Sequence, residues 1–175
     1  MDCSNLQDCG GQIKDYNTFN PYLLIGKSNT GWNFLYEPLY FYNAYDNKGE
    51  NIIPWIATGH EFNEDFTEVV INIRPGVTWS DGVAWTADDL VFTVNMLREN
   101  APELTYSTDM ENWVESAVAV DSLTARIVLT APNPRFVFSY FTSNFGIGVP
   151  IVPQHVWQGK DPNTFTNFDM QKGWP

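Results

Sequence analysis

The chain has 175 residues with 21 acidic and nine basic side chains, which gives a formal charge of −12 at pH 7. That length is enough for one or two small domains with a buried core, and the negative charge disfavours nucleic acid as a partner. Because no run of 18 apolar residues occurs, no membrane-spanning helix is expected.

The first part of the chain is largely irregular, and its only cysteines lie there. Cys3 and Cys9 would close a short loop if they formed a disulfide, or they remain free thiols. From Asn20 to Gly31 the sequence is rich in Ser, Asn, Thr and Gly and has no periodicity, which indicates a loop. The other elements expected here are a short strand around Gln12–Ile13, a helical turn over Trp32–Glu37 and an aromatic strand over Leu39–Tyr45.

Alternating apolar residues predict a sheet in the middle of the chain. After an apolar run at Ile52–Ala57, the segment Glu68–Arg74 places every second side chain, beginning with Val69, on one face. Val114–Val120 and Thr124–Thr130 flank the turn Asp121-Ser122 and predict an antiparallel hairpin.

Helical periodicity is clearest in residues 87–98. There the apolar stripe Leu90, Val91, Val94 and Leu97 would pack against a sheet, and Pro102 bars continuation. Shorter helices are expected over residues 135–142 and from Pro153. The order of strands, helix, hairpin and helix predicts an α+β fold with a mixed or antiparallel sheet and packed helices.

The stretch from Arg74 to Phe92 combines two turns and a helix start. Pro75-Gly76 and Asp81-Gly82 are typical of tight turns. Thr86 is the expected N-cap of the following helix, with Asp89 completing a capping-box-like pair. Trp79 and Trp85 are expected to anchor the turn and the helix, and Asp81 to accept backbone N–H groups in its turn.

The same stretch, R-P-G-V-T-W-S-D-G-V-A-W-T-A-D-D-L-V-F, resembles the signature of extracellular solute-binding proteins of the dipeptide, oligopeptide, nickel and oligosaccharide class, which serve ABC importers. Four other segments resemble family segments in the same order. They are Leu35–Leu39, Ile53–Ala57, Pro132–Phe136 and Ile151–His155, with Ile56 where the family has leucine.

The resemblance implies a two-lobed periplasmic binding protein-like fold that is several times longer than 175 residues. This chain would then be an N-terminal portion. Residues 1–44 would begin the ligand-binding lobe, 45–166 would form its lateral α+β subdomain, and 167–175 would start the return to the lobe. It also implies a monomeric, periplasmic or extracellular receptor that closes on its ligand and serves an ABC permease. A lipoprotein anchor on the full-length form stays open.

The sequence lacks the motifs of several other functional classes. His60 and His155 are far apart and form no metal motif. Nucleophile-elbow, dinucleotide and phosphate-loop patterns are absent as well. Acidic pairs are present, but Asp88-Asp89 is already explained by the helix start. We therefore expect no catalytic residue, metal or cofactor.

Side chains suited to a neutral polar ligand occur in the loop before residue 34. Asn29 and Asn33 offer amide donors and acceptors, and Trp32 offers a stacking face. The resemblance implies that this loop faces the ligand cleft and that Tyr106, after the long helix, points toward the ligand. The alternative is an ordinary loop with a buried Trp32 and a surface Tyr106.

Two other functional hypotheses compete with the receptor. A free-standing aromatic carbohydrate-binding module would need exposed tryptophan faces, so burial of Trp32 and Trp113 would count against it. A glycosidase would need two carboxylates facing each other across a cleft. For the receptor itself, a sugar and a peptide ligand both remain open. The seven Trp, eight Tyr and 12 Phe residues favour a sugar mildly.

Overall fold

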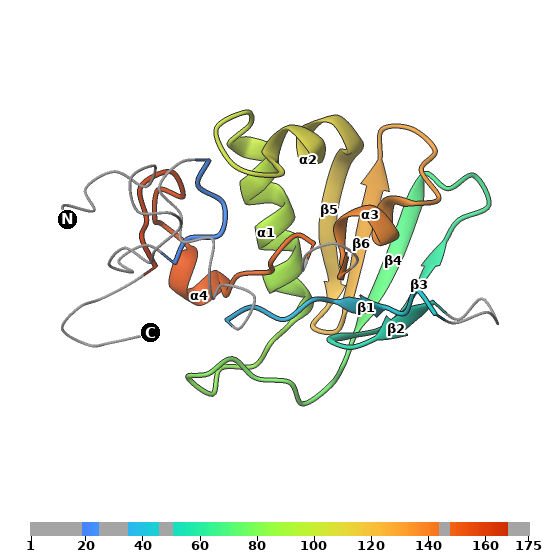
Figure 1. The fold of residues 1–175 in the computed structure, drawn as a ribbon, viewed down its shortest axis with the longest axis horizontal. Helices are drawn as coiled ribbons and strands as arrows, with labels where there is room; N and C mark the ends of the chain where they lie inside the picture. Colours follow the sequence, from blue (N-terminus) through green and yellow to red (C-terminus); the bar gives the residue numbers. More distant parts are fainter. Residues whose placement is uncertain (1–18, 25–34, 46–50, 144–147, 168–175) are drawn as a thin grey trace.

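The computed structural model describes residues 19–24, 35–45, 51–143 and 148–167. These residues form two sheets with short helices around them (Figure 1). The larger sheet has the order β3-β4-β6-β5 and is antiparallel throughout, whereas the smaller sheet has the order β2-β1-β7 with one parallel pair. The predicted α+β class is therefore confirmed.

The bounds of the elements follow the chain order. The strands are β1 (Tyr40–Tyr42), β2 (Ile52–Pro54), β3 (Ala57–Phe62), β4 (Glu68–Ile73), β5 (Val114–Asp121), β6 (Thr124–Leu129) and β7 (Thr142–Ser143). The helices are α1 (Ala87–Glu99), α2 (Ser107–Trp113), α3 (Phe136–Tyr140) and α4 (Gln154–Trp157). None of the helices in the described ranges is long and apolar enough to cross a membrane.

The larger sheet follows the alternation in the sequence. Val69, Ile71 and Ile73 of β4 are buried on one face. On the neighbouring strand β6, Ile127 pairs with Val69 and Ala125 with Ile71, so apolar side chains of adjacent strands share the same face. The predicted hairpin of β5 and β6 is confirmed, with Val118 opposite Arg126 on the exposed face.

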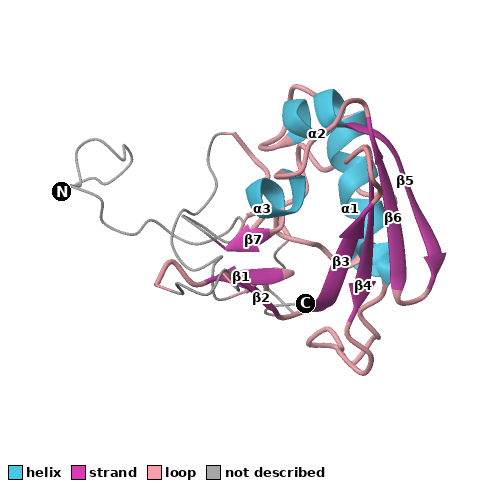
Figure 2. Ribbon diagram, turned by 90° about the vertical axis from the view of Figure 1, so that its right-hand side faces the viewer, coloured by secondary structure: helices cyan, strands magenta, loops and turns pink. Residues whose placement is uncertain are grey.

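Helix α1 covers the buried face of this sheet, together with α2 (Figure 2). Leu90, Val94 and Leu97 are fully buried, and Val91 at the edge of the predicted stripe is half-buried. Full burial of each such aliphatic side chain stabilises the fold by about 1.5–3 kcal/mol. The helix begins after the predicted N-cap Thr86 and ends at Glu99, three residues before the predicted break at Pro102, with Asn100 as its C-cap.

Several boundaries differ from the sequence-based expectation. The aromatic strand is only Tyr40–Tyr42, and the apolar run at 52–57 divides into β2 and the start of β3. The division has a structural cause: Trp55 and Ala57 both donate their backbone N–H to the carbonyl of Leu39, at 3.1 and 3.2 Å, which bends the chain there. The expected elements at residues 12–13 and Cys3 and Cys9 lie outside the described residues.

The ends of the described region lie against each other. Asn20 donates from its side chain to the carbonyls of Pro162 and Phe165, at 2.7 and 2.8 Å. The Trp157 ring packs edge-on against Tyr22 and Phe165, with centroids 5.9 and 4.9 Å apart. Residues 19–24 and 148–167 therefore form one packed layer beside α1, although they are far apart in sequence.

Candidate ligand-binding site

Tyr106 stands at the N-terminal end of α2 in a backbone conformation that is uncommon for its residue type. Its φ of 68° and ψ of −4° lie in the left-handed region, where a non-glycine residue carries strain. The side chain is half-buried and packs against the core. Burial, and secondly the charge of Asp109, raises the pKa of the Tyr106 hydroxyl, so the hydroxyl is protonated and can donate at neutral pH.

Asp109 also interacts with a second tyrosine. The Tyr140 hydroxyl donates to Oδ1 of Asp109 at 3.1 Å. Burial first, and then this carboxylate, raises the pKa of Tyr140 to about 12. Two protonated tyrosine hydroxyls and one carboxylate are therefore gathered at the start of α2, a set that can bind hydroxyl or amide groups.

The other three predicted ligand contacts, Asn29, Trp32 and Asn33, lie outside the described residues. Tyr22 and Leu23, which come before these three residues in the chain, are bound to the segment that carries Tyr106. Leu23 forms an antiparallel bridge with Leu104, and the backbone N–H of Thr105 donates to the carbonyl of Tyr22 at 2.7 Å. The chain therefore enters the predicted ligand loop next to Tyr106.

The residues that follow the loop are fixed at a different place. The Tyr36 hydroxyl accepts from Nδ2 of Asn167 at 2.7 Å and donates to the carbonyl of Phe19 at 3.1 Å. Burial raises the pKa of this hydroxyl well above its ordinary range. Both flanks of the loop are thus anchored by buried hydrogen bonds to residues distant in sequence.

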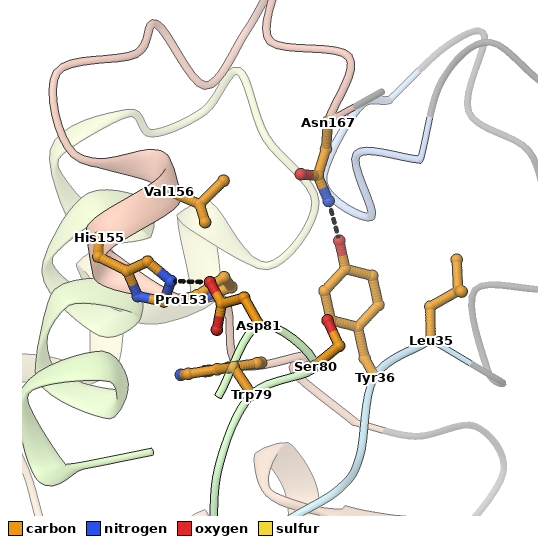
Figure 3. Close-up of a pocket in the computed structure, with 9 residues that line it drawn as sticks. All are labelled: Leu35, Tyr36, Trp79, Ser80, Asp81, Pro153, His155, Val156 and Asn167. Atoms are coloured by element: carbon orange, nitrogen blue, oxygen red, sulfur yellow. Dashed lines mark hydrogen bonds and ion pairs between the residues drawn. The ribbon is translucent and has the colours of Figure 1, made fainter. Parts of the chain in front are cut away.

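A small pocket lies beside Tyr36, and an ion pair forms its opposite wall (Figure 3). Nε2 of His155 is 2.7 Å from Oδ2 of Asp81. The backbone N–H of Val83 donates to Oδ1 of Asp81 at 3.0 Å, as predicted for this turn. That N–H is the largest cause of the lowered pKa of Asp81, followed by the hydrogen bond to His155. We call this hollow the Asp81–His155 pocket.

Asp89 connects three segments around this pocket. It is only 4% exposed. Its Oδ2 accepts from the backbone N–H of Thr86 at 2.9 Å and from Nε1 of Trp79 at 3.2 Å, while Oδ1 accepts from the backbone N–H of Gln154 at 2.8 Å. The predicted capping partner of α1 thus also binds the preceding turn and the start of α4.

One turn further along α1, Oγ1 of the fully buried Thr93 accepts from the backbone N–H of Val152 at 3.1 Å. The Trp79 and Trp85 rings are stacked with centroids 5.9 Å apart, and Trp85 is buried. The expectation that these tryptophans anchor the turn and the helix is confirmed.

The signature stretch and the four other segments that resemble the family make five, and four of these five meet around Trp79. Its neighbours in two adjacent pockets come from the segments Leu35–Leu39, Ile53–Ala57 and Ile151–His155, as well as from the signature itself. We call this meeting point the Trp79 junction. Sequence reasoning considered His155 only as a metal ligand and missed its pairing with Asp81, because 74 residues separate the two. Among the described residues, no group of three or more His, Cys, Asp or Glu could hold a metal ion.

Comparisons with known proteins agree with this geometry. A sequence model described as "Bacterial extracellular solute-binding proteins, family 5 Middle" matches residues 51–171. "Uncharacterized protein YejA" of Escherichia coli is 27% identical over 157 residues, which cover 85% of this chain and 24% of YejA.

Two solved structures show how the fold compares. The mannohexaose-bound periplasmic oligopeptide-binding protein of Thermotoga maritima is 34% identical with a TM-score of 0.58, and the match covers 73% of this chain and 22% of that one. NikZ of Campylobacter jejuni, in complex with Ni(L-His), has a TM-score of 0.68 at 19% identity, with 87% of this chain and 28% of NikZ covered.

This chain therefore spans about a quarter of the length of the proteins that it matches. The family model covers well over half of the 175 residues, and the fold of most of the chain is similar to that of both solved structures. The chain belongs to the bacterial extracellular solute-binding proteins of family 5.

Proposed function

We propose that this chain is part of the ligand-binding lobe of a receptor that captures an oligosaccharide or a short peptide and delivers it to an ABC permease. The observation that carries the proposal is the bridge between Leu23 and Leu104. It holds Leu23, which precedes Asn29, Trp32 and Asn33 in the chain, beside the segment that carries Tyr106. The described residues before one predicted ligand segment are thus paired with the described residues before the other.

The proposed mechanism is closure of two lobes around the ligand. A ligand that contacts both lobes stabilises the closed state in proportion to its preference for that state. The proteins that the chain matches are about four times as long, which supports a second lobe outside these 175 residues. In this proposal residues 1–44 begin the lobe, 45–166 form its lateral subdomain, and 167–175 lead back.

The small sheet shows how the first of these segments is held. Strand β1, from the first segment, pairs with β2 and with β7, which both come from the second segment. The first segment is thus bound to the lateral subdomain by backbone hydrogen bonds on both sides. A rigid unit of this kind is suited to move as one body when the lobes close.

The ligand class rests on chemistry and on one relative. The Thermotoga maritima protein is named for oligopeptides and was solved with mannohexaose, so one scaffold of this family is associated with both ligand classes. Protonated tyrosines beside Asp109 can bind sugar hydroxyls or peptide groups alike. We propose a non-catalytic, monomeric receptor without a cofactor, which is periplasmic or extracellular.

The half-buried, core-packed Trp113 argues against a free-standing carbohydrate-binding module. Family membership argues against it more strongly.

Calorimetry on the full-length protein tests the proposal, with mannohexaose and with a defined set of tripeptides to pentapeptides as ligands. We expect one of these classes to bind, and Tyr106→Ala to weaken that binding about 30-fold, since an aromatic contact and a hydrogen bond are each worth about 1 kcal/mol. Tyr42→Ala, an exposed tyrosine of β1, is the matched control. Equal loss in both variants, or no binding of either class, would contradict the proposal.

The 175-residue chain alone should bind weakly, because the differential contact with a second lobe is absent.

A further inference from the structure

A second hollow shares Trp79 with the Asp81–His155 pocket. Its volume is about 280 Å³, close to the lower end of the size range of small-molecule sites. Leu35, Trp79 and Ser80 line both hollows, and all three are labelled in Figure 3. We call the second one the Glu37 hollow, after the one charged residue among those that line it.

The floor and one wall of this hollow are apolar. Ile56, Trp85 and Ile151 are buried residues at its base. The indole of Trp79 is half-buried and stacked on Trp85 at an interplanar angle of 23°. A flat aromatic wall over an aliphatic base favours an alkyl chain, and the indole faces also attract a cation.

The Trp79 ring is held in place before any ligand arrives. Its backbone N–H donates to the carbonyl of Val83 at 2.8 Å, and that of Trp85 donates to the carbonyl of Val77 at 3.0 Å. The indole N–H of Trp79 donates to the carboxylate of Asp89. A wall fixed in this way loses little conformational entropy when a ligand binds against it.

The carboxylate of Glu37, an exposed residue that lines the hollow, is held by a hydrogen bond. Nε1 of Trp55 donates to its Oε2 at 2.7 Å. Trp55 is in turn held by an edge-on contact with Phe41, with centroids 5.4 Å apart, and by Arg74, whose Nε donates to the Trp55 carbonyl at 2.7 Å. This network orients the carboxylate without neutralising it.

No cation from the described part of the chain pairs with this carboxylate. The ion pairs there are Arg126 with Glu68 and His155 with Asp81. Arg74, although it binds Trp55, forms none with Glu37 within 4.0 Å. The other polar groups among the lining side chains are the hydroxyls of Thr78 and Ser80 and the indole N–H groups of Trp79 and Trp85, none of which carries a charge.

We propose that the Glu37 hollow binds an alkylammonium group, with the alkyl stem between Trp79 and the aliphatic base and the ammonium at the Glu37 carboxylate. An unpaired carboxylate in a hollow that is also lined by the indole rings of Trp79 and Trp85 is suited to a cation, because carboxylates and indole faces both attract positive charge. A neutral sugar would gain the stacking contact but would leave the carboxylate without a cation. The group could belong to a free amine or to a lysine side chain of a peptide. The proposal is independent of lobe closure, since every residue that it uses is in the described part of the chain.

Calorimetric or NMR titration of the full chain with n-butylammonium chloride tests this inference. We expect saturable binding with a dissociation constant on the order of 1 mM. Glu37→Gln, which keeps an oxygen acceptor for Trp55, should weaken it at least about fivefold. Glu64→Gln, which removes an exposed carboxylate in the turn between β3 and β4, should leave it unchanged.

Three further ligands separate the alternatives. n-Butanol, which has the stem without the charge, should bind much more weakly than the amine. N-acetyl-lysine methylamide should bind if the site accepts a lysine side chain, and it should fail if only free amines fit. Equal affinity of butanol and butylammonium, preferential binding of methyl mannoside, or equal affinity of the Glu37→Gln and Glu64→Gln variants would each overturn the proposal. Circular dichroism of both variants shows whether the fold is intact.

Discussion

The sheet unit of β3 to β6 with α1 and the Trp79 junction are stabilised in different ways. In the sheet unit, β4 and β6 bring apolar faces together, and α1 covers them with fully buried aliphatic residues such as Leu90. At the junction, buried polar groups connect segments far apart in sequence, as Asp89 does with Gln154 and Thr93 with Val152. The first region depends on area buried, and the second on individual hydrogen bonds.

Because the two regions are stabilised in different ways, they should respond differently to mutation. An apolar helix–sheet interface tolerates changes of shape that conserve volume. A junction in which one carboxylate accepts three N–H groups does not, because loss of that side chain leaves donors without acceptors. We therefore expect mutations in the sheet unit to lower the free energy of unfolding of the whole fold. Mutations at the junction should mainly reduce hydrogen-exchange protection of the segments that meet there.

The largest effect is expected in the sheet unit. Leu90→Ala removes a fully buried side chain from the helix–sheet interface and should lower the free energy of unfolding by about 3–4 kcal/mol, from lost burial and the cavity left behind. Val91→Ala, at the half-buried edge of the same stripe, should cost about 1 kcal/mol. Urea denaturation followed by circular dichroism measures both. Equal losses would show that α1 is not packed as described.

A smaller and more local effect is expected at the junction. Asp89→Ala removes the acceptor of three hydrogen bonds and should cost about 2–3 kcal/mol, with loss of hydrogen-exchange protection at Gln154 before β6 is affected. Asp88→Ala is the matched control, because Asp88 is exposed on the same helix turn and contributes mainly about 0.5 kcal/mol through the helix dipole. Uniform loss of protection in Asp89→Ala would contradict the proposed division of roles.

The same contrast explains what the sequence could predict about the fold. Helix α1 and the hairpin of β5 and β6 are long enough for their periodicity to be read, and they pair with close neighbours in the chain. Strand β3 reads A-T-G-H-E-F, which has no clear alternation, and it becomes a strand because β4 pairs with it. Helix α2 has seven residues and buries only Ser107 and Met110, too few for a helical stripe to be visible.

Prediction of the candidate site was limited for a related reason. The turn at Asp81 and the capping pair at Asp89 follow from local chemistry and were predicted. The contact of Asp81 with His155, and the ties of Tyr22 and Leu23 to residues 104–105, join positions that no local pattern relates. The resemblance implied that Tyr106 points toward the ligand, and the Leu23–Leu104 bridge supports that proposal. The ligand roles of Asn29, Trp32, Asn33 and Tyr106 stay predictions.

The smallest effect concerns the exposed pair at the junction, and its sign follows from the direction of a pKa shift. The pKa of Asp81 is lowered from its ordinary value of 3.8 in the folded state, so the ionised carboxylate stabilises the fold. That contribution is fully present above pH 3.8 and is lost as the pH falls through the lower folded-state value. The stability gap between the natural protein and Asp81→Asn should therefore be wider at pH 6 than at pH 3 in urea denaturation.

A second variant separates the two causes of this shift. The backbone N–H of Val83 is the larger cause and His155 the smaller, so His155→Gln should retain most of the difference in stability between pH 6 and pH 3 that depends on Asp81. If His155→Gln abolished that difference, the ion pair and not the turn would dominate the ionisation of Asp81. In that case acid would destabilise the contact between α4 and the Trp79 junction, because His155 lies on α4. The turn that carries Trp79 would keep its geometry. Hydrogen exchange at Val83 and at Val156, measured at both pH values, distinguishes these outcomes, since the turn protects the first amide and α4 the second.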